Sequence, residues 1–186
     1  EKRELPKLYS FDIFDTLISR KVLNPIGIFY YVKEKIEKSD YGFPLFLVKK
    51  YPKIRQEAEK NVRDYYIKTL ALREDERREI FFDDIFDRIQ YVYGITDEQK
   101  QILKDFELEA EYENSIPLPE KIGFIEELLE RGDKAVLISD MYLPKEFVRK
   151  LLYKANPILA ELPMFLSSDY GVQKTTKLLY LEVYKS

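Results

Sequence analysis

The chain has 186 residues, of which 45% are hydrophobic and 35% are charged, and it contains neither cysteine nor histidine. This balance predicts one folded domain, or a small core domain with an insertion. The missing residue types exclude disulfides, thiol nucleophiles, Cys/His zinc sites and any triad with an imidazole base. A formal net charge of -3 provides no basic field, so neither nucleic acid nor an anionic membrane is expected as a partner.

The apolar residues come in short runs, none of which approaches the roughly 18 residues that a membrane span requires. We therefore expect no membrane span. The absence of cysteine is compatible with a reducing compartment, and the cytoplasm is the predicted location.

The first half of the chain predicts one strand followed by helices. Aromatic and β-branched residues at 8–14 indicate a buried strand that ends near Asp12. Residues 25–115 contain no comparable run and show helical periodicity instead. The predicted helices are 26–38, 53–72, 80–93 and 97–113. Gly94 is a suitable C-cap, Thr96 with Gln99 is a capping-box signature, and the mixed charges at 73–79 indicate a solvated turn.

In the last 70 or so residues, helices and strands alternate. Helices are predicted at 119–130 and 145–154, and strands at 134–139 and 163–167. This alternation is typical of parallel βα units, so the fold class is α/β. The predicted core comprises residues 1–24 and 116–186, separated by a helical insertion at 25–115.

Three distant segments carry side chains suited to phosphoryl chemistry. Asp12 lies within segment 11–17, Ser139 ends a strand, and Lys174 follows Gly171 by three residues. Carboxyl ends of parallel strands line the crevice where open α/β sheets bind ligands. In order and spacing, the three segments resemble the first three motifs of the haloacid dehalogenase superfamily.

This resemblance implies a Rossmann-like parallel sheet with an inserted helical cap of the C1 type. Asp12 would be the covalent nucleophile that forms an aspartyl-phosphate. Lys174 would neutralise both this carboxylate and the phosphoryl oxygens. Ser139 and Thr16 would help to bind or orient the phosphate.

Phe14 departs from the family pattern, which usually has a second Asp there as general acid/base. A benzyl group cannot transfer a proton, and such assistance is typically worth ~10²–10⁴ in rate. Asp15 is a candidate replacement, although family members with Asp-Asp-Thr already carry an Asp at that position. The resemblance also implies Mg²⁺, bound by Asp12 and by the backbone carbonyl that Phe14 retains.

The family's fourth motif, an acidic group that completes Mg²⁺ coordination, has no counterpart in residues 175–186. We expect it beyond Ser186, together with the C-terminal part of the core. Mg²⁺ needs near-octahedral oxygen ligation, which Asp12 and one carbonyl leave incomplete.

The leading hypothesis is a Mg²⁺-dependent phosphatase or phosphotransferase that acts on a small phosphorylated metabolite or sugar phosphate. One alternative is hydrolysis of carbon–halogen bonds, since the family's dehalogenases also carry an aromatic residue in place of the second Asp. Another is a degenerate, non-catalytic binding or assembly module. The segments at 11–17 and 139–144 look like a bacterial branch fused to, or found beside, surface-polysaccharide glycosyltransferases, which makes such a domain an expected partner.

Other conspicuous residues receive structural interpretations. Asp140 and Asp169 are typical of local capping residues. The tyrosine pairs at 30–31 and 65–66 are interpreted as packing between cap helices, with a role in facing the substrate left open.

Overall fold

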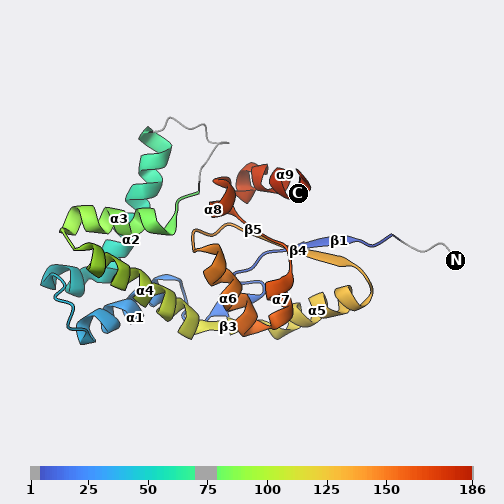
Figure 1. The fold of residues 1–186 in the computed structure, drawn as a ribbon, viewed down its shortest axis with the longest axis horizontal. Coiled ribbons are helices and arrows are strands. Elements are labelled where there is room, and N and C mark those ends of the chain that lie inside the picture. The colour runs from blue at the N-terminus through green and yellow to red at the C-terminus, as the bar shows by residue number, and fades with distance from the viewer. Residues whose placement is uncertain (1–4, 70–78, 186) are drawn as a thin grey trace. The chain divides into compact units, whose positions relative to one another are not determined.

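The computed structural model describes residues 5–69 and 79–185, and it divides into two compact units (Figure 1). The α/β unit is Glu1–Ser19 with Ile116–Ser186, and the helical unit is Arg20–Ser115. The chain first passes from the α/β unit to the helical unit after Ser19, whereas the sequence analysis placed this boundary after residue 24. No helix in the described ranges is long and apolar enough to cross a membrane.

The α/β unit is built on a parallel sheet in the order β1-β4-β5. The strands are β1 (Leu8–Phe11), β4 (Lys134–Ser139) and β5 (Met164–Leu166). This confirms the mixed α/β class and the parallel strands. β1 ends at Phe11, next to Asp12 as predicted, and the backbone then turns back: the Leu17 N–H donates to the Ile13 carbonyl over 2.9 Å. The prediction that this strand is buried was wrong, because its residues are exposed or half-buried.

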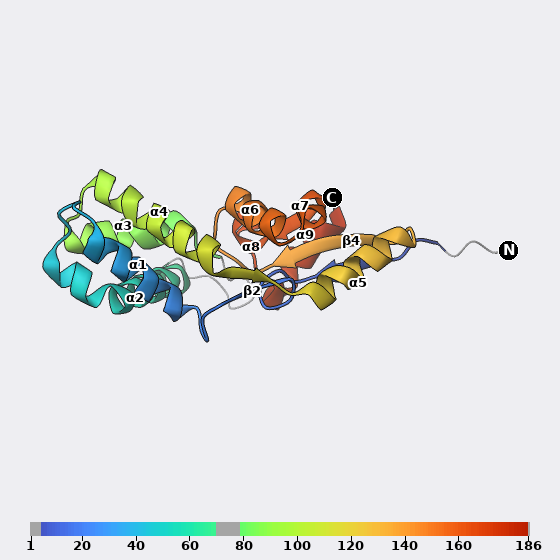
Figure 2. The ribbon, with the colours of Figure 1, turned by 90° about the horizontal axis from the view of Figure 1, so that it is seen from below.

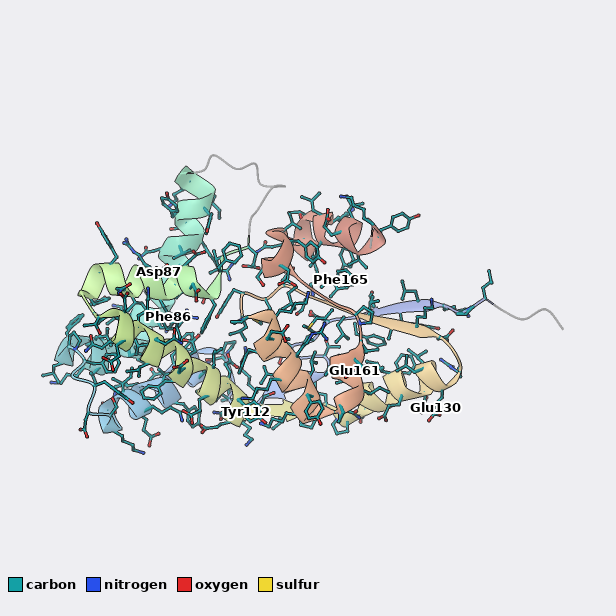
Figure 3. All side chains as sticks on the ribbon, in the orientation of Figure 1. Phe86, Asp87, Tyr112, Glu130, Glu161 and Phe165 are labelled. Atoms are coloured by element: carbon teal, nitrogen blue, oxygen red, sulfur yellow. The ribbon has the colours of Figure 1, made fainter. Side chains whose placement is uncertain are left out.

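Helices cover both faces of this sheet (Figure 1). On one face lies α5 (Pro119–Glu130), whose Phe124 ring meets those of Tyr9 and Phe11 edge to face at 6.5 and 6.2 Å. On the other face, α9 (Leu178–Lys185) buries Leu179 against Val136, Ile138 and Phe165. Figure 3 labels Phe165, which is a residue of β5. The remaining elements are α6 (Lys145–Ala155), α7 (Pro157–Glu161), α8 (Ser167–Tyr170) and the 3₁₀ helix η2 (Lys174–Thr176).

The chain passes between the two units through a two-stranded sheet that the sequence did not predict. Its strands are β2 (Ile18–Arg20) and β3 (Ser115–Pro117). Both strands have three residues and, unlike β5, contain no continuous apolar run, which explains the omission. Beside the pair, Leu118 N–H donates to the Leu17 carbonyl and Lys21 N–H to the Asn114 carbonyl, each over 2.9 Å. The first of these hydrogen bonds joins the two chain segments at the boundary of the α/β unit, and the second joins those at the boundary of the helical unit.

The helical unit consists of α1 (Ile26–Lys38), α2 (Leu45–Thr69), α3 (Phe82–Tyr93) and α4 (Asp97–Asn114) within its described residues. α1 contacts α2 and α4, and α3 contacts the same two helices, as Figure 2 shows. This cyclic contact pattern is that of a four-helix bundle. The predicted capping features are confirmed: Thr96 and Gln99 bond reciprocally, and Gly94 ends α3 with φ 64°.

Three sequence predictions for this unit were wrong. α2 begins at Leu45 and includes Pro52, because Leu47 and Tyr51 are fully buried and their packing offsets the hydrogen bond that proline cannot make. α3 begins at Phe82 rather than residue 80. Glu79 is buried and bonds to Arg63 over 2.8 Å, so it is not part of a solvated turn. The rest of that turn, and residues 70–72 of the second predicted helix, lie outside the described residues.

An ion pair occupies the core of the bundle. Arg55 on α2 and Glu107 on α4 are 0% and 1% exposed and form two hydrogen bonds of 2.8 and 2.7 Å. The Arg55 guanidinium also lies 4.7 Å from the centre of the Phe29 ring. Burial raises the pKa of the Glu107 carboxyl above its ordinary value, and Arg55 opposes that shift.

Candidate functional site

The site centres on the carboxylate of Asp12, the first residue after β1. Ser139 Oγ donates to Asp12 Oδ1 over 2.7 Å, and Lys174 Nζ donates to Asp12 Oδ2 over 2.6 Å. Ser139 and Lys174 lie 127 and 162 residues away along the chain. The structure thus brings together the three side chains that the sequence singled out.

A tight turn holds Asp12 at the end of its strand. The backbone N–H of Ile13 donates to Asp12 Oδ1 over 2.8 Å. Ile13 and Leu17 are fully buried, and they anchor the turn on both sides. The Asp12 side chain nevertheless stays 41% exposed, so its carboxylate is oriented by donors and still accessible, as a nucleophile requires.

Ser139 and Lys174 reach this carboxylate from different kinds of structure. Ser139 is 2% exposed and ends the central strand β4, which fixes its position. Lys174 is the first residue of the 3₁₀ helix η2, and α9 starts only at Leu178. Its backbone N–H donates to Asp140 Oδ1 over 2.8 Å.

The other residues predicted near Asp12 are not joined to this network. Asp15 has a φ of 56°, which Asp tolerates better than most residues, and its carboxylate accepts from Ser19 Oγ over 2.9 Å. Phe14 is half-buried and forms a backbone bridge with Ile18. Thr16 is half-buried, and its side chain has no hydrogen bond within the described part of the chain.

The described residues do not complete a Mg²⁺ site. Asp12 is the carboxylate of the network, and its two oxygens already accept from Ser139, Ile13 and Lys174. Across residues 5–69 and 79–185, no group of three or more acidic side chains could hold a metal ion. Since Mg²⁺ demands octahedral oxygen ligation, we assign no chemical step to it here.

Asp140 and Asp169, interpreted from the sequence as local capping residues, also contact residues that are distant in the sequence. Asp140 bonds to the backbone of Lys174, which is 34 residues away. Asp169 Oδ2 pairs with Lys145 Nζ over 2.6 Å, 24 residues away. The one sequence signal for Asp140 is its place directly after the strand-end residue Ser139.

The tyrosine pairs are less packed than the sequence suggested. Tyr30, Tyr31 and Tyr65 are 62%, 42% and 57% exposed, and Tyr66 Oη donates to Asp84 over 3.0 Å. Tyr65 and Tyr66 line a pocket of about 390 Å³ within the helical unit. Its other lining residues are Asn61, Val62, Asp84, Asp87 and Arg88. A substrate-facing role for these tyrosines stays an open prediction.

Comparison with protein-family models found no match to this chain, and comparison with curated proteins found no matching relative. The functional argument therefore depends on the residues of the site and on their geometry.

Proposed function

We propose that this chain is a hydrolase of the haloacid dehalogenase type, which transfers a phosphoryl group from a small phosphorylated metabolite or sugar phosphate to Asp12. One observation carries the proposal: the exposed Asp12 carboxylate receives side-chain donors from Ser139 and Lys174 at the ends of separate elements. A carboxylate placed between a hydroxyl and an ammonium group is suited to attack a phosphoryl group whose oxygens those same donors can bind.

The reaction would proceed in two displacements. In the first, an Asp12 carboxylate oxygen bonds to phosphorus while the bond from phosphorus to the leaving oxygen breaks, and this oxygen takes a proton from solvent, which yields an aspartyl-phosphate and an alcohol. In the second, water bonds to phosphorus and gives up a proton to solvent while the bond from phosphorus to the Asp12 oxygen breaks, which releases inorganic phosphate and regenerates the Asp12 carboxylate. Lys174 and Ser139 stabilise the phosphoryl oxygens in both steps.

The helical unit would act as the cap that selects the substrate and excludes water. A Rossmann-like topology of the core belongs to the same proposal. Mg²⁺ is the cofactor that the resemblance implies, and its requirement is to be measured directly by adding and removing it.

A second candidate is a non-catalytic binding or assembly module that works with a polysaccharide-synthesis glycosyltransferase. Phe14 favours it, because this residue places no proton donor beside Asp12. The nearest further carboxylate in sequence, Asp15, is bonded to Ser19. Both features would slow hydrolysis without preventing a ligand from binding at Asp12.

Turnover measurements separate these candidates. The full-length protein is assayed with and without Mg²⁺ on phosphorylated sugars and, in parallel, on 2-haloacids. We expect phosphate release that Asp12→Asn abolishes, together with loss of BeF₃⁻ binding, because an amide cannot form the acyl-phosphate. The variant should stay folded, since Asn retains an oxygen that can accept from Ser139 and Ile13.

Asp15→Asn is the matched control, because Asp15 is a second carboxylate in the same turn as Asp12. It should retain turnover within about 3-fold; a loss as deep as that of Asp12→Asn would make Asp15 the acid/base. Release of halide alone would replace phosphoryl transfer with dehalogenation. Absence of turnover on every substrate, with BeF₃⁻ binding intact, would favour the binding module.

A further inference from the structure

Ser139 and Asp140, two consecutive residues at the end of β4, form hydrogen bonds with two different partners. Ser139 Oγ bonds to the carboxylate of Asp12, whereas Asp140 Oδ1 accepts the backbone N–H of Lys174 over 2.8 Å. Lys174 in turn extends its ammonium group to Asp12. One strand end therefore fixes both the carboxylate and the backbone from which its counter-ion projects.

The N–H of Lys174 needs such an acceptor from outside its own element. Lys174 is the first residue of η2, so its N–H has no partner inside this three-residue helix. Gln173, the residue before it, provides no side-chain cap. Asp140 fills this role from 34 residues away, and its carboxylate makes a charge-assisted hydrogen bond.

Two more contacts join the segment after β4 to the segment after β5. The Met141 N–H donates to Ser167 Oγ over 2.8 Å, and Lys145 Nζ pairs with Asp169 over 2.6 Å. Ser167 is fully buried. These contacts hold the segment after β4 to the segment after β5, and the Asp140 contact is the one of the three that reaches Lys174.

We propose that Asp140 is a positioning residue for Lys174. A lysine side chain has a flexible four-carbon stem, so a fixed backbone is what limits where its ammonium group can go. Loss of the Asp140 contact frees the start of η2 and weakens the Lys174–Asp12 pair. The consequence for catalysis rests on the proposed function, whereas the consequence for the position of Lys174 does not.

The test uses the full chain and measures how fast acetic anhydride modifies Lys174, by mass spectrometry and relative to the exposed Lys177. Asp140→Ala should raise this relative rate roughly 3- to 10-fold, the range that one lost hydrogen bond represents. Asp140→Asn keeps an acceptor oxygen and should stay within about 2-fold of the wild type. Asp169→Asn is the matched control: it breaks a link between the same segments without touching Lys174, and should change nothing.

Turnover gives the second readout. Asp140→Ala should lower kcat by about 10²-fold with a smaller change in KM, because misplacing a charged group by about 1 Å costs that much, and Asp140→Asn should restore most of it. If the alanine variant does not fold, Asp140→Ser replaces it, since its shorter side chain cannot span the same distance. Amide hydrogen exchange of the wild type adds a measurement that needs no variant: the Lys174 amide should be protected relative to Thr175.

Two outcomes would overturn the inference, namely an unprotected Lys174 amide or a labelling rate that Asp140→Ala leaves unchanged. Neither depends on turnover. A wild type that turns over no substrate would refute the proposed function, and labelling would still decide the role of Asp140.

Discussion

Phe14 is expected to limit the rate of the proposed reaction. It follows Asp12 by two positions, where a proton donor would assist departure of the leaving group, and it supplies only a half-buried ring. A site of this kind should form the aspartyl-phosphate more readily than it hydrolyses it, or perform both steps slowly.

Phe14→Asp should therefore raise phosphatase turnover at least ~10-fold, a fraction of the ~10²–10⁴ usually attributed to a positioned acid/base. The measurement is steady-state phosphate release by full-length protein, after circular dichroism has verified folding. Folding has to be checked because Phe14 is half-buried. Removing a fully buried aromatic ring costs ~3–5 kcal/mol of stability, which is the upper limit for this substitution.

Phe14→Asn is the control, because it makes the same change in size without adding a group that can transfer a proton. Equal gains in both variants would point to relief of crowding rather than to acid catalysis. No gain in the aspartate variant, beside brisk turnover of the wild type, would mean that another residue already supplies the proton.

At the scale of single elements, the buried pair between α2 and α4 makes the helical unit sensitive to substitution. Arg55→Met should lower the free energy of unfolding by about 3–5 kcal/mol, because it leaves Glu107 buried without its partner. The double variant Arg55→Met/Glu107→Leu should recover most of this loss, since it removes both charges. Urea unfolding followed by circular dichroism measures both changes.

Lys38→Met provides the comparison, because it breaks an exposed pair with Glu34 on α1. Exposed pairs contribute little, so the free energy of unfolding should stay essentially unchanged. A large loss in the double Arg55/Glu107 variant would show that the pair contributes net stability beyond its apolar replacement.

Elements with a clear period were predictable from the sequence, and those decided by tertiary contacts were not. α1 and β4 have the predicted bounds because their apolar residues repeat at 3.6 positions or run continuously. The predicted helix began at residue 53, directly after Pro52, whereas α2 begins at Leu45, and nothing local reveals that Tyr51 would be buried. The same holds at the site: Asp12, Ser139 and Lys174 stand at strand and helix ends, whereas the contact from Asp140 to Lys174 exists only in the folded chain.

At the scale of the whole molecule, the division into two units gives a way to separate phosphoryl chemistry from substrate choice. Leu17 bonds to Leu118 and Lys21 bonds to Asn114, so the ends of each unit are adjacent. Replacing Arg20–Ser115 with Asn-Gly would join Ser19 to Ile116 through a two-residue hairpin turn. The α/β unit would keep its own sheet, its helices and the Asp12 network.

If the helical unit is the cap, this excised protein should still bind BeF₃⁻ at Asp12 but lose selectivity. We expect the ratio of kcat/KM between the best and the poorest phosphorylated substrate to fall at least ~10-fold, because pocket contacts commonly supply discrimination of that size. The excised protein carrying Asp12→Asn is the control and should bind no BeF₃⁻. Selectivity equal to that of the full chain would remove the helical unit from substrate choice, and an excised protein without cooperative unfolding would show that the α/β unit depends on the helices to fold.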